Sequence, residues 1–305
     1  MGLNDVRRLP VVTPGRETAA PEPPVFGRIG IVGMGLIGGS IALAARQRWT
    51  SGLLVAVDTK EVLEKAMARH AADVAADDPA VLADVDLVVL AAPVRQNLDL
   101  LARLPECLAG RAVVTDTGGT KREIVEAARA LPARLEFVGG HALGGAARGG
   151  IEHARADLFA GRPWVFTPES TAAGPTLERL FAFATGLGAV PRAMSPMDHD
   201  ALLAYISHLP QLVSSALMHV IGEAASGGGL ALTGRGLQDV TRLASSPAGI
   251  WRDICAGNAD QIGPALDTLI AVLGELRDNL HASETIDRVF ASANRWRDEL
   301  QSGRP

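Results

Sequence analysis

The chain has 305 residues, of which 48% are apolar and 21% are charged. This composition predicts about two domains with buried cores and excludes a disordered chain or a mini-protein. The net charge of -5 without a long basic run argues against nucleic acid as a partner, and Cys107 and Cys255 lack metal-binding or redox spacing. We therefore expect no metal site and two reduced thiols in a cytoplasmic protein.

Residues 1–25 hold five prolines among scattered charges and few apolar anchors, which predicts a flexible tail. From Phe26 onward, short apolar runs end in Gly, Asp or Pro, and helical patterns follow most of them. The predicted strands are Arg28–Gly33, Leu53–Asp58, Asp86–Pro93, Ala112–Asp116, Glu136–Gly140, Pro163–Thr167 and Ala189–Ala193. This alternation is typical of a parallel α/β sheet, and we assign residues 26–193 to one α/β domain.

After Ser195 the pattern becomes helical to the end of the chain, which predicts an all-α domain over residues 194–305. The predicted helices are Asp198–Ala225, Leu237–Ala244, Ile250–Cys255, Ala259–His281 and Glu284–Gln301. Several are apolar on more than one face, so we expect a homodimer built on these helices. The uncharged run Ile29–Ala45 contains five glycines, which argues against a membrane span and a membrane partner.

The segment Gly33-Met34-Gly35-Leu36-Ile37-Gly38 fits the G-x-G-x-x-G pattern of a Rossmann-type dinucleotide site. It follows the strand Ile29–Val32 and leads into the helix Ser40–Arg48. The first glycine permits a tight turn, the second leaves room for a pyrophosphate, and the third lets the helix approach the strand. The free amides at this helix start, including those of Leu36 and Ile37, are expected to hold the phosphates.

Asp58 ends the second predicted strand, twenty positions after Gly38, where a carboxylate can accept hydrogen bonds from the ribose hydroxyls. A carboxylate there repels a 2′-phosphate, so NAD is favoured over NADP, although Lys60 and Arg69 leave NADP open. Ala92 and Pro93 end another predicted strand at the same sheet edge and are expected to line the cofactor pocket.

Four further segments carry a resemblance to a known family. They are Asp116-Thr117-Gly118-Gly119-Thr120-Lys121, Gly139-Gly140-His141-Ala142-Leu143-Gly144-Gly145, His199-Asp200 with Ser207-His208-Leu209-Pro210, and Asp239-Val240-Thr241-Arg242 with Pro247, Trp251 and Asp253-Ile254. They resemble, in the same order, the signatures of the prephenate and arogenate dehydrogenases. The resemblance covers the chain from about Arg28 to Ile254.

The resemblance implies NAD-dependent oxidative decarboxylation of prephenate to 4-hydroxyphenylpyruvate, or of arogenate to tyrosine, in tyrosine biosynthesis. His141 is then the catalytic base or acceptor for the substrate hydroxyl. Arg242 is the expected clamp for a substrate carboxylate, with Asp239 three positions earlier to orient it. His208 serves either the floor of the substrate pocket or a structural hydrogen bond.

Three positions depart from the family pattern. Gly119 stands where the family has a serine that contacts the substrate hydroxyl, so Thr120 or a water is left to supply that contact. Ala142 replaces the proline that follows the family's histidine. Gln211 replaces a second histidine of prephenate-using relatives, which favours the amino acid side chain of arogenate. The same departures suit 4-amino-4-deoxyprephenate as an alternative substrate in a secondary-metabolite pathway.

Two other hypotheses compete with this one. A different hydroxyacid dehydrogenase of the same plan predicts a catalytic lysine on the long helix, and Asp198–Ala225 contains none. A non-catalytic NAD-binding homologue has no need of His141 or Arg242, so the presence of both residues favours an enzyme.

Overall fold

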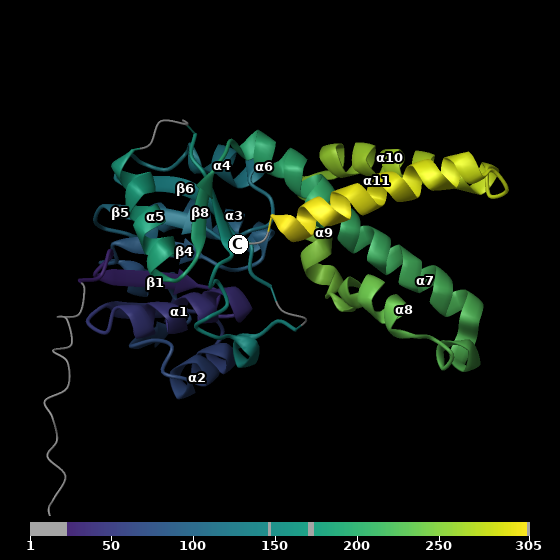
Figure 1. The fold of residues 1–305 in the computed structure, drawn as a ribbon. Helices are drawn as coiled ribbons and strands as arrows, with labels where there is room; N and C mark the ends of the chain where they lie inside the picture. Colours follow the sequence, from purple (N-terminus) through teal and green to yellow (C-terminus); the bar gives the residue numbers. More distant parts are fainter. Residues whose placement is uncertain (1–22, 146–147, 170–173, 304–305) are drawn as a thin grey trace, which may run out of the picture.

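A computed structural model describes residues 23–145, 148–169 and 174–303. It has an α/β part that reaches Ala193 and a helical part that begins at Pro196 (Figure 1). The expected fold class, a Rossmann-type α/β domain followed by helices, is confirmed. Most of the predicted N-terminal tail, residues 1–22, lies outside the described residues.

Eight strands form one sheet in the order β3-β2-β1-β4-β5-β6-β7-β8. Their bounds are β1 Arg28–Val32, β2 Leu53–Val57, β3 Val74–Ala76, β4 Leu87–Leu90, β5 Ala112–Asp116, β6 Leu135–Ala142, β7 Pro163–Thr167 and β8 Val190–Ala193. Strands β1 to β6 are parallel, whereas β7 runs antiparallel to β6, and β8 is parallel to β7. The expectation of a wholly parallel sheet is therefore wrong for β7 and β8, and β3 was not predicted.

Helices cover both faces of the sheet, which is why its central strands are continuous apolar runs. One face packs against α1 (Leu36–Arg48), α2 (Lys60–Ala68) and α5 (Pro175–Gly186), around the buried rings of Trp49, Trp164 and Phe183. The other face packs against α3 (Val94–Cys107) and α4 (Arg122–Ala128). The run Ile29–Ala45 forms most of β1 and α1, and most of its residues are buried in the α/β part.

The helical part begins with α6 (Pro196–Leu203), which continues through a π-helical turn, η3 (Ala204–His208), into α7 (Leu209–Leu230). We expected a single regular helix here. Pro210 has no N–H to donate to the preceding turn, and the helix widens just before it. The following elements are α8 (Arg235–Val240), η4 (Arg242–Ser245), α9 (Ala248–Gly257), α10 (Ala259–Asp278) and α11 (Ser283–Ser302).

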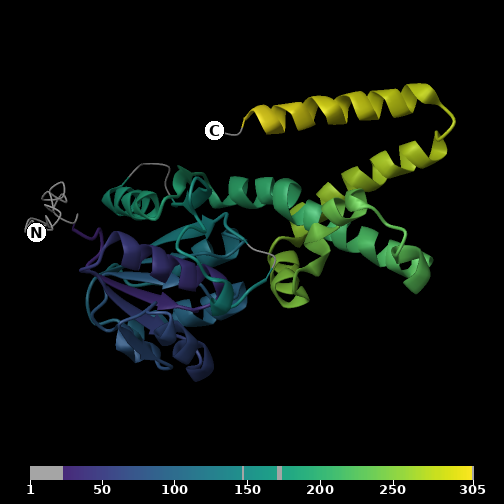
Figure 2. The same cartoon turned by 60° about the horizontal axis from the view of Figure 1, so that its bottom comes forward.

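Much of the helical part is apolar and exposed. Pro196–Ala225 is long and apolar enough to cross a membrane by length and composition alone, and 28% of its most apolar window is buried. Helix α11 has no buried residue within its bounds, and Phe290, Trp296 and Leu300 are all more than half exposed. In Figure 2, α11 runs back from its connection to α10 and is set apart from the sheet.

Candidate active site

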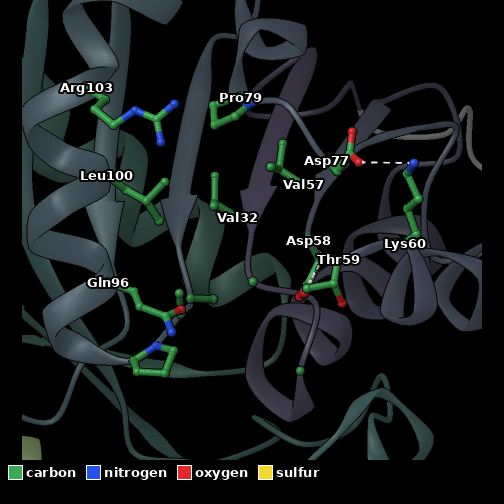
Figure 3. Close-up of a pocket in the computed structure, with 15 residues that line it drawn as sticks. Val32, Val57, Asp58, Thr59, Lys60, Asp77, Pro79, Gln96, Leu100 and Arg103 are labelled. Atoms are coloured by element: carbon green, nitrogen blue, oxygen red, sulfur yellow. Dashed lines mark hydrogen bonds and ion pairs between the residues drawn. The ribbon is translucent and has the colours of Figure 1, made fainter.

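The glycine-rich turn opens into a cavity of about 750 Å³ at the carboxyl ends of β1, β2 and β4 (Figure 3). Among the residues predicted to bind the cofactor, Gly33, Gly35, Asp58, Ala92 and Pro93 all line it. Val57, Pro79 and Leu100 give it apolar walls suited to a flat ring such as adenine. Leu36 and Ile37 are half-buried against the core, so their backbone amides rather than their side chains can serve a ligand.

The three glycines of the turn have the geometry that a dinucleotide site needs. Gly33 has φ of 94°, and a Cβ on it would lie 2.6 Å from the amide nitrogen of Ala92. A Cβ on Gly38 would lie 1.9 Å from the carbonyl oxygen of Gly33. A Cβ on Gly35 meets nothing within 4 Å, which leaves open space beside the helix start. The fold therefore requires Gly33 and Gly38, whereas Gly35 leaves room for a ligand.

Asp58 accepts hydrogen bonds from the amides of Met34 at 2.6 Å and Thr59 at 2.7 Å, so its carboxylate also fixes the glycine turn. Each carboxylate oxygen keeps a lone pair for a ribose hydroxyl. Of the two cations that left NADP open, Lys60 lines this cavity, whereas Arg69 does not. Lys60 pairs with Asp77 at 3.7 Å, and Arg69 donates to the carbonyls of Glu152 and Ala154 at 2.8 and 2.6 Å.

A cluster of polar side chains lies at the ends of β5 and β6, beside this cavity. His141 is near the end of β6, and its Nδ1 lies 2.9 Å from Nε2 of His199 on α6. Nδ1 of His199 lies 2.8 Å from Oδ1 of Asp200. His141 also lines a cavity of about 340 Å³ together with Leu143, Gly144, Leu203, Ile206 and Ser207. A ligand in that cavity would meet the imidazole of His141.

The carboxylate of Asp200 is fully buried and saturated with hydrogen bonds. Besides His199, its Oδ1 accepts from the amide of Lys121 at 2.8 Å. Its Oδ2 accepts from the amide of Arg122 at 3.0 Å and from Nε of Arg122 at 3.1 Å. These bonds join the first helix of the helical part to the start of α4 in the α/β part.

A buried ion pair holds the backbone that presents His141. The ammonium of Lys121 bonds the carboxylate of Asp116, and both side chains are at most 1% exposed. Lys121 also donates to the carbonyl of Gly140 at 2.7 Å, while Oδ1 of Asp116 accepts from the Gly140 amide at 3.0 Å. Both the N–H and the carbonyl of Gly140 are therefore hydrogen-bonded, which holds the backbone in place directly before His141.

His208 is buried and belongs to the same network. Asn258 donates from Nδ2 to the carbonyl of Asp200 at 2.8 Å, and that nitrogen lies 3.2 Å from Nδ1 of His208. The His208 ring also lies edge-on to Trp251, with centroids 6.1 Å apart, and hydrogen-bonds the Gly119 backbone. The structure thus brings His208 and Gly119 together at the edge of the cluster.

The loop that carries Gly119 lies between the cofactor cavity and α9. A Cβ on Gly118 would meet Val94, the residue after Pro93, at 3.2 Å. A Cβ on Gly119 would meet Cδ1 of Ile254 at 3.3 Å, so an isoleucine methyl occupies the side where a serine would point. Thr120 is buried, and its hydroxyl faces Gly257 and has no hydrogen-bond partner among the described residues, so it is turned toward α9.

Gln211 has both amide hydrogens engaged within the chain. Its Nε2 donates to the carbonyl of Leu243 at 2.8 Å and to the hydroxyl of Ser215 at 3.2 Å, and its Oε1 accepts from Ser246 at 3.0 Å. Gln211 therefore holds the η4 segment that carries Arg242. The Arg242 side chain is exposed, and within the described ranges neither it nor Asp239 has an ion-pair partner.

The histidines of this cluster are neutral at neutral pH. Burial, followed by unfavourable electrostatic interactions with His199 and Lys121, lowers the pKa of His141 well below its usual value. Burial also lowers the pKa of His199, against the opposing effect of Asp200, and lowers the pKa of His208 to about 4. Burial acts to raise the pKa of Asp200, but hydrogen bonds from His199 and the amides of Arg122 and Lys121 outweigh it and lower that pKa.

Several members of this network had no predicted role. His199, Asp200 and Lys121 stood in the quoted signatures without an assigned function, and Asn258 was not singled out at all. The adjacent His199-Asp200 pair, three residues into a helix that opens with Ser195-Pro196, was the available signal. Its partners lie 58 to 79 positions away in the chain, which no local pattern reveals.

Comparison with protein families gives two matches that together span most of the chain. Residues 41–192 match the model of the prephenate dehydrogenase nucleotide-binding domain. Residues 195–292 match the model of the prephenate dehydrogenase dimerization domain.

Individual relatives agree with these matches. The chain is 32% identical over 280 residues to a prephenate dehydrogenase of Bacillus subtilis, covering 88% of this chain and 75% of the relative. It is similar to a crystal structure of prephenate dehydrogenase from A. aeolicus in complex with hydroxyphenyl propionate and NAD+, with a TM-score of 0.82, 28% identity, and coverage of 90% and 98%. For the Synechocystis arogenate dehydrogenase structure the TM-score is 0.74, with 30% identity and coverage of 90% and 99%.

The second and third glycines of the motif, Gly35 and Gly38, are predicted to behave differently on substitution. In Gly35→Ala the new methyl projects into open space, so we expect unchanged thermal unfolding but NAD+ affinity weakened roughly 5- to 150-fold, because the methyl meets the phosphates. In Gly38→Ala the methyl overlaps a carbonyl, so we expect a loss of about 1–3 kcal/mol in the free energy of unfolding. Calorimetric titration and denaturant unfolding measure the two effects. Unchanged affinity in Gly35→Ala would place the phosphates elsewhere.

Proposed function

This chain belongs to the prephenate dehydrogenase family, and we propose that it catalyses the NAD+-dependent oxidative decarboxylation of prephenate or arogenate. One observation carries the proposal most directly. A neutral, half-buried imidazole, His141, stands at the sheet edge next to a dinucleotide cavity and is held there by a hydrogen-bonded chain that ends on a buried carboxylate. This arrangement suits an acceptor for an alcohol proton beside a hydride acceptor.

The cofactor site fits NAD+ better than NADP+. Gly35 leaves space for the pyrophosphate, the amides from Gly33 to Gly38 can hold it, and Asp58 can accept from the ribose hydroxyls. Ala92 and Pro93 close the cavity on the side of β4. When bound, NAD+ supplies the acceptor for the hydride that leaves C4 of the substrate.

The chain's own residues then have to accept and return one proton and bind the two carboxylates of the substrate. His141 accepts the proton of the 4-hydroxyl as C4 becomes a carbonyl carbon, and it returns that proton to the oxygen once loss of CO2 from C1 has made the ring aromatic. Aromatisation supplies the driving force. Because the pKa of His141 is lowered by burial, its neutral form is present throughout the neutral pH range, and turnover requires no prior deprotonation.

Arg242 is the proposed clamp for a substrate carboxylate. Its guanidinium is exposed and has no ion-pair partner within the described residues, and a planar fork of donors matches a carboxylate. Gln211 supports this role indirectly, because it fixes the carbonyl of Leu243 next to Arg242. Since both Gln211 amide hydrogens are engaged, Gln211 gives no preference between the keto acid of prephenate and the amino acid of arogenate.

We assign the cofactor and the catalytic His141 to residues 26–193, and the other substrate contacts and dimerisation to residues 194–305. A second copy of the chain is the proposed cover for the exposed apolar faces of α10 and α11, consistent with the dimerization model that matches residues 195–292. Both free cysteines, Cys107 and Cys255, are half-buried, which suits the reducing cytoplasm.

The direct test of the proposed function is NADH formation by the purified protein with NAD+ and, in parallel, prephenate, arogenate and 4-amino-4-deoxyprephenate. We expect turnover of prephenate or arogenate, with NADP+ as the poorer cofactor. The third substrate belongs in the assay because Gly119 lacks the hydroxyl that relatives place near C4. Turnover of that amine alone would replace the proposed substrate, and no turnover with NAD+ bound would indicate a non-catalytic homologue.

His141→Asn removes the proton acceptor and preserves a polar side chain of smaller volume. We expect kcat to fall roughly 100- to 10,000-fold, the usual contribution of a general base, with NAD+ affinity unchanged in calorimetric titration. A parallel loss of NAD+ affinity would show that His141 supports the cofactor site structurally.

Arg242→Gln removes the charge that we assign to carboxylate binding. We expect KM to rise roughly 30-fold or more, equivalent to the loss of about 2 kcal/mol of charge pairing, with a smaller change in kcat. Arg235→Gln, at the start of the neighbouring α8, is the matched control, and it should leave KM unchanged. Equal KM values for the two variants would remove Arg242 from the substrate site.

The dimer has its own test. We expect light scattering to give twice the mass of one chain for the wild type, and a shift toward one chain mass for Trp296→Glu, because a charge would replace an exposed apolar ring of α11. Asp298→Lys, on the opposite side of the same helix, should remain dimeric. A wild-type mass of one chain at working concentration would contradict the assignment.

A further inference from the structure

We propose that His199 and Asp200 are positioning residues that fix the tautomer of His141, so that its Nε2 presents a lone pair to the substrate hydroxyl. The identity of that hydroxyl rests on the proposed function, but the tautomer of His141 follows from the hydrogen bonds among Asp200, His199 and His141. No sequence signature used above assigned either residue a role.

Asp200 determines the donor and acceptor roles in the hydrogen bonds that lead to His141. A carboxylate has about four acceptor positions, and here four donors fill them: the amides of Lys121 and Arg122, Nε of Arg122, and Nδ1 of His199. The two amides and the guanidinium can only donate. Both oxygens of Asp200 must therefore act as acceptors, which requires the ionised carboxylate and places a hydrogen on Nδ1 of His199.

That hydrogen determines the two bonds that follow. A neutral His199 with a hydrogen on Nδ1 has a bare Nε2, which can only accept. Nε2 lies 2.9 Å from Nδ1 of His141, so Nδ1 of His141 donates to it. The remaining nitrogen of neutral His141, Nε2, is then an acceptor. An alcohol that donates to this nitrogen is oriented to lose its proton there.

The surroundings of His141 make this support necessary. Among the described residues, His199 is the one hydrogen-bond partner of the His141 side chain. The family's serine is Gly119 in this chain, and Ile254 packs against that position, so no hydroxyl from there can orient the imidazole. The orientation of His141 in this chain therefore depends on the link through His199 to Asp200.

The same link offsets the charge that forms during reaction. When the substrate O–H bond breaks, its proton moves to Nε2 of His141, and the electron pair of the C4–H bond leaves as hydride to NAD+. The proton returns to the phenolate oxygen after the C1–CO2 bond breaks and its electron pair enters the ring. While it is protonated, His141 donates a hydrogen bond to Nε2 of His199, and Nδ1 of His199 donates to the carboxylate of Asp200. That carboxylate stays ionised throughout.

The charged and titratable groups near His141 come from four elements. His199 and Asp200 belong to α6, His208 belongs to η3, Lys121 immediately precedes α4, and its partner Asp116 ends β5. Lys121 and the two histidines disfavour a positive charge on His141, whereas Asp200 is the anion linked to it by hydrogen bonds. Removal of the Asp200 charge should therefore make a protonated His141 harder to form.

The tautomer is measured directly by ¹⁵N NMR of the imidazoles in the unliganded protein, with the seven histidines labelled. The His141 signals are assigned from their absence in His141→Asn. We expect a neutral ring with the hydrogen on Nδ1, in contrast to the Nε2–H form that prevails for free histidine. A hydrogen on Nε2, or a doubly protonated ring at neutral pH, overturns the proposal.

The kinetic test uses Asp200→Asn, which keeps the side-chain shape and removes the charge. In one orientation the NH2 of the asparagine faces His199 and the Lys121 amide, and in the other it faces the amide and Nε of Arg122. Either orientation sets donor against donor and disrupts the hydrogen bonds that lead to His141. We expect kcat to fall roughly 100- to 10,000-fold with unchanged NAD+ affinity, together with a change in the His141 tautomer. Unchanged kcat and unchanged tautomer overturn the proposal.

A matched control is Asp73→Asn. Asp73 also accepts from a backbone amide, that of Leu54 at 2.8 Å, and pairs with an arginine, Arg46 at 2.7 Å, but it lies beside β2, away from the cluster. It should keep the wild-type kcat. If Asp200→Asn does not fold, the wild-type spectrum and His199→Gln decide, since His199→Gln should alter the His141 shifts and lower kcat without affecting NAD+ affinity.

The two proposals fail in different ways. If the wild type turns over none of the three substrates, the proposed function fails, while the ¹⁵N spectrum still tests the tautomer. If the wild type is active but His141 carries its hydrogen on Nε2, the positioning role fails and the function stands.

Discussion

The buried carboxylate of Asp200 is the interaction on which the rest of the site depends. It comes from the first helix of the helical part and accepts from the start of α4 in the α/β part, so it joins the two parts where the candidate active site forms. Leaving a buried ion without its partners is costly, so the geometry around Asp200 is held tightly. His199 transmits that fixed position to His141.

The sheet supplies the other half of the arrangement. Leu90 of β4 pairs in register with Asp116 of β5, and Asp116 in turn bonds the Gly140 amide of β6. The carboxyl ends of three neighbouring strands therefore lie at one edge, where ligands of parallel sheets collect. Pro93 and Gly119 follow the ends of β4 and β5, and His141 is near the end of β6, which places the cofactor cavity beside the imidazole. The buried pair of Lys121 and Asp116 keeps the last two strand ends together.

The sequence predicted the parts of this design that local rules control. The turn from Gly33 to Gly38 depends on space near the backbone, and the structure has the three geometries that the motif predicts. Most central strands were predicted because burial on both faces makes them uniformly apolar. The reversed direction of β7 was not predicted, because a short apolar run does not indicate in which direction the strand runs. The roles of His199 and Asp200, and the orientations of Thr120 and Gln211, depend on partners far away in the chain, so no local pattern specified them.

In the proposed reaction, hydride leaves C4 of a cyclohexadienyl substrate while His141 accepts the hydroxyl proton. A substrate that carries deuterium at C4 tests this reaction, by measuring where the label goes and how much CO2 is released. We expect one labelled NADH and one CO2 for each substrate consumed, with no label in the solvent. Label in water, or substrate consumed without both products, would contradict it.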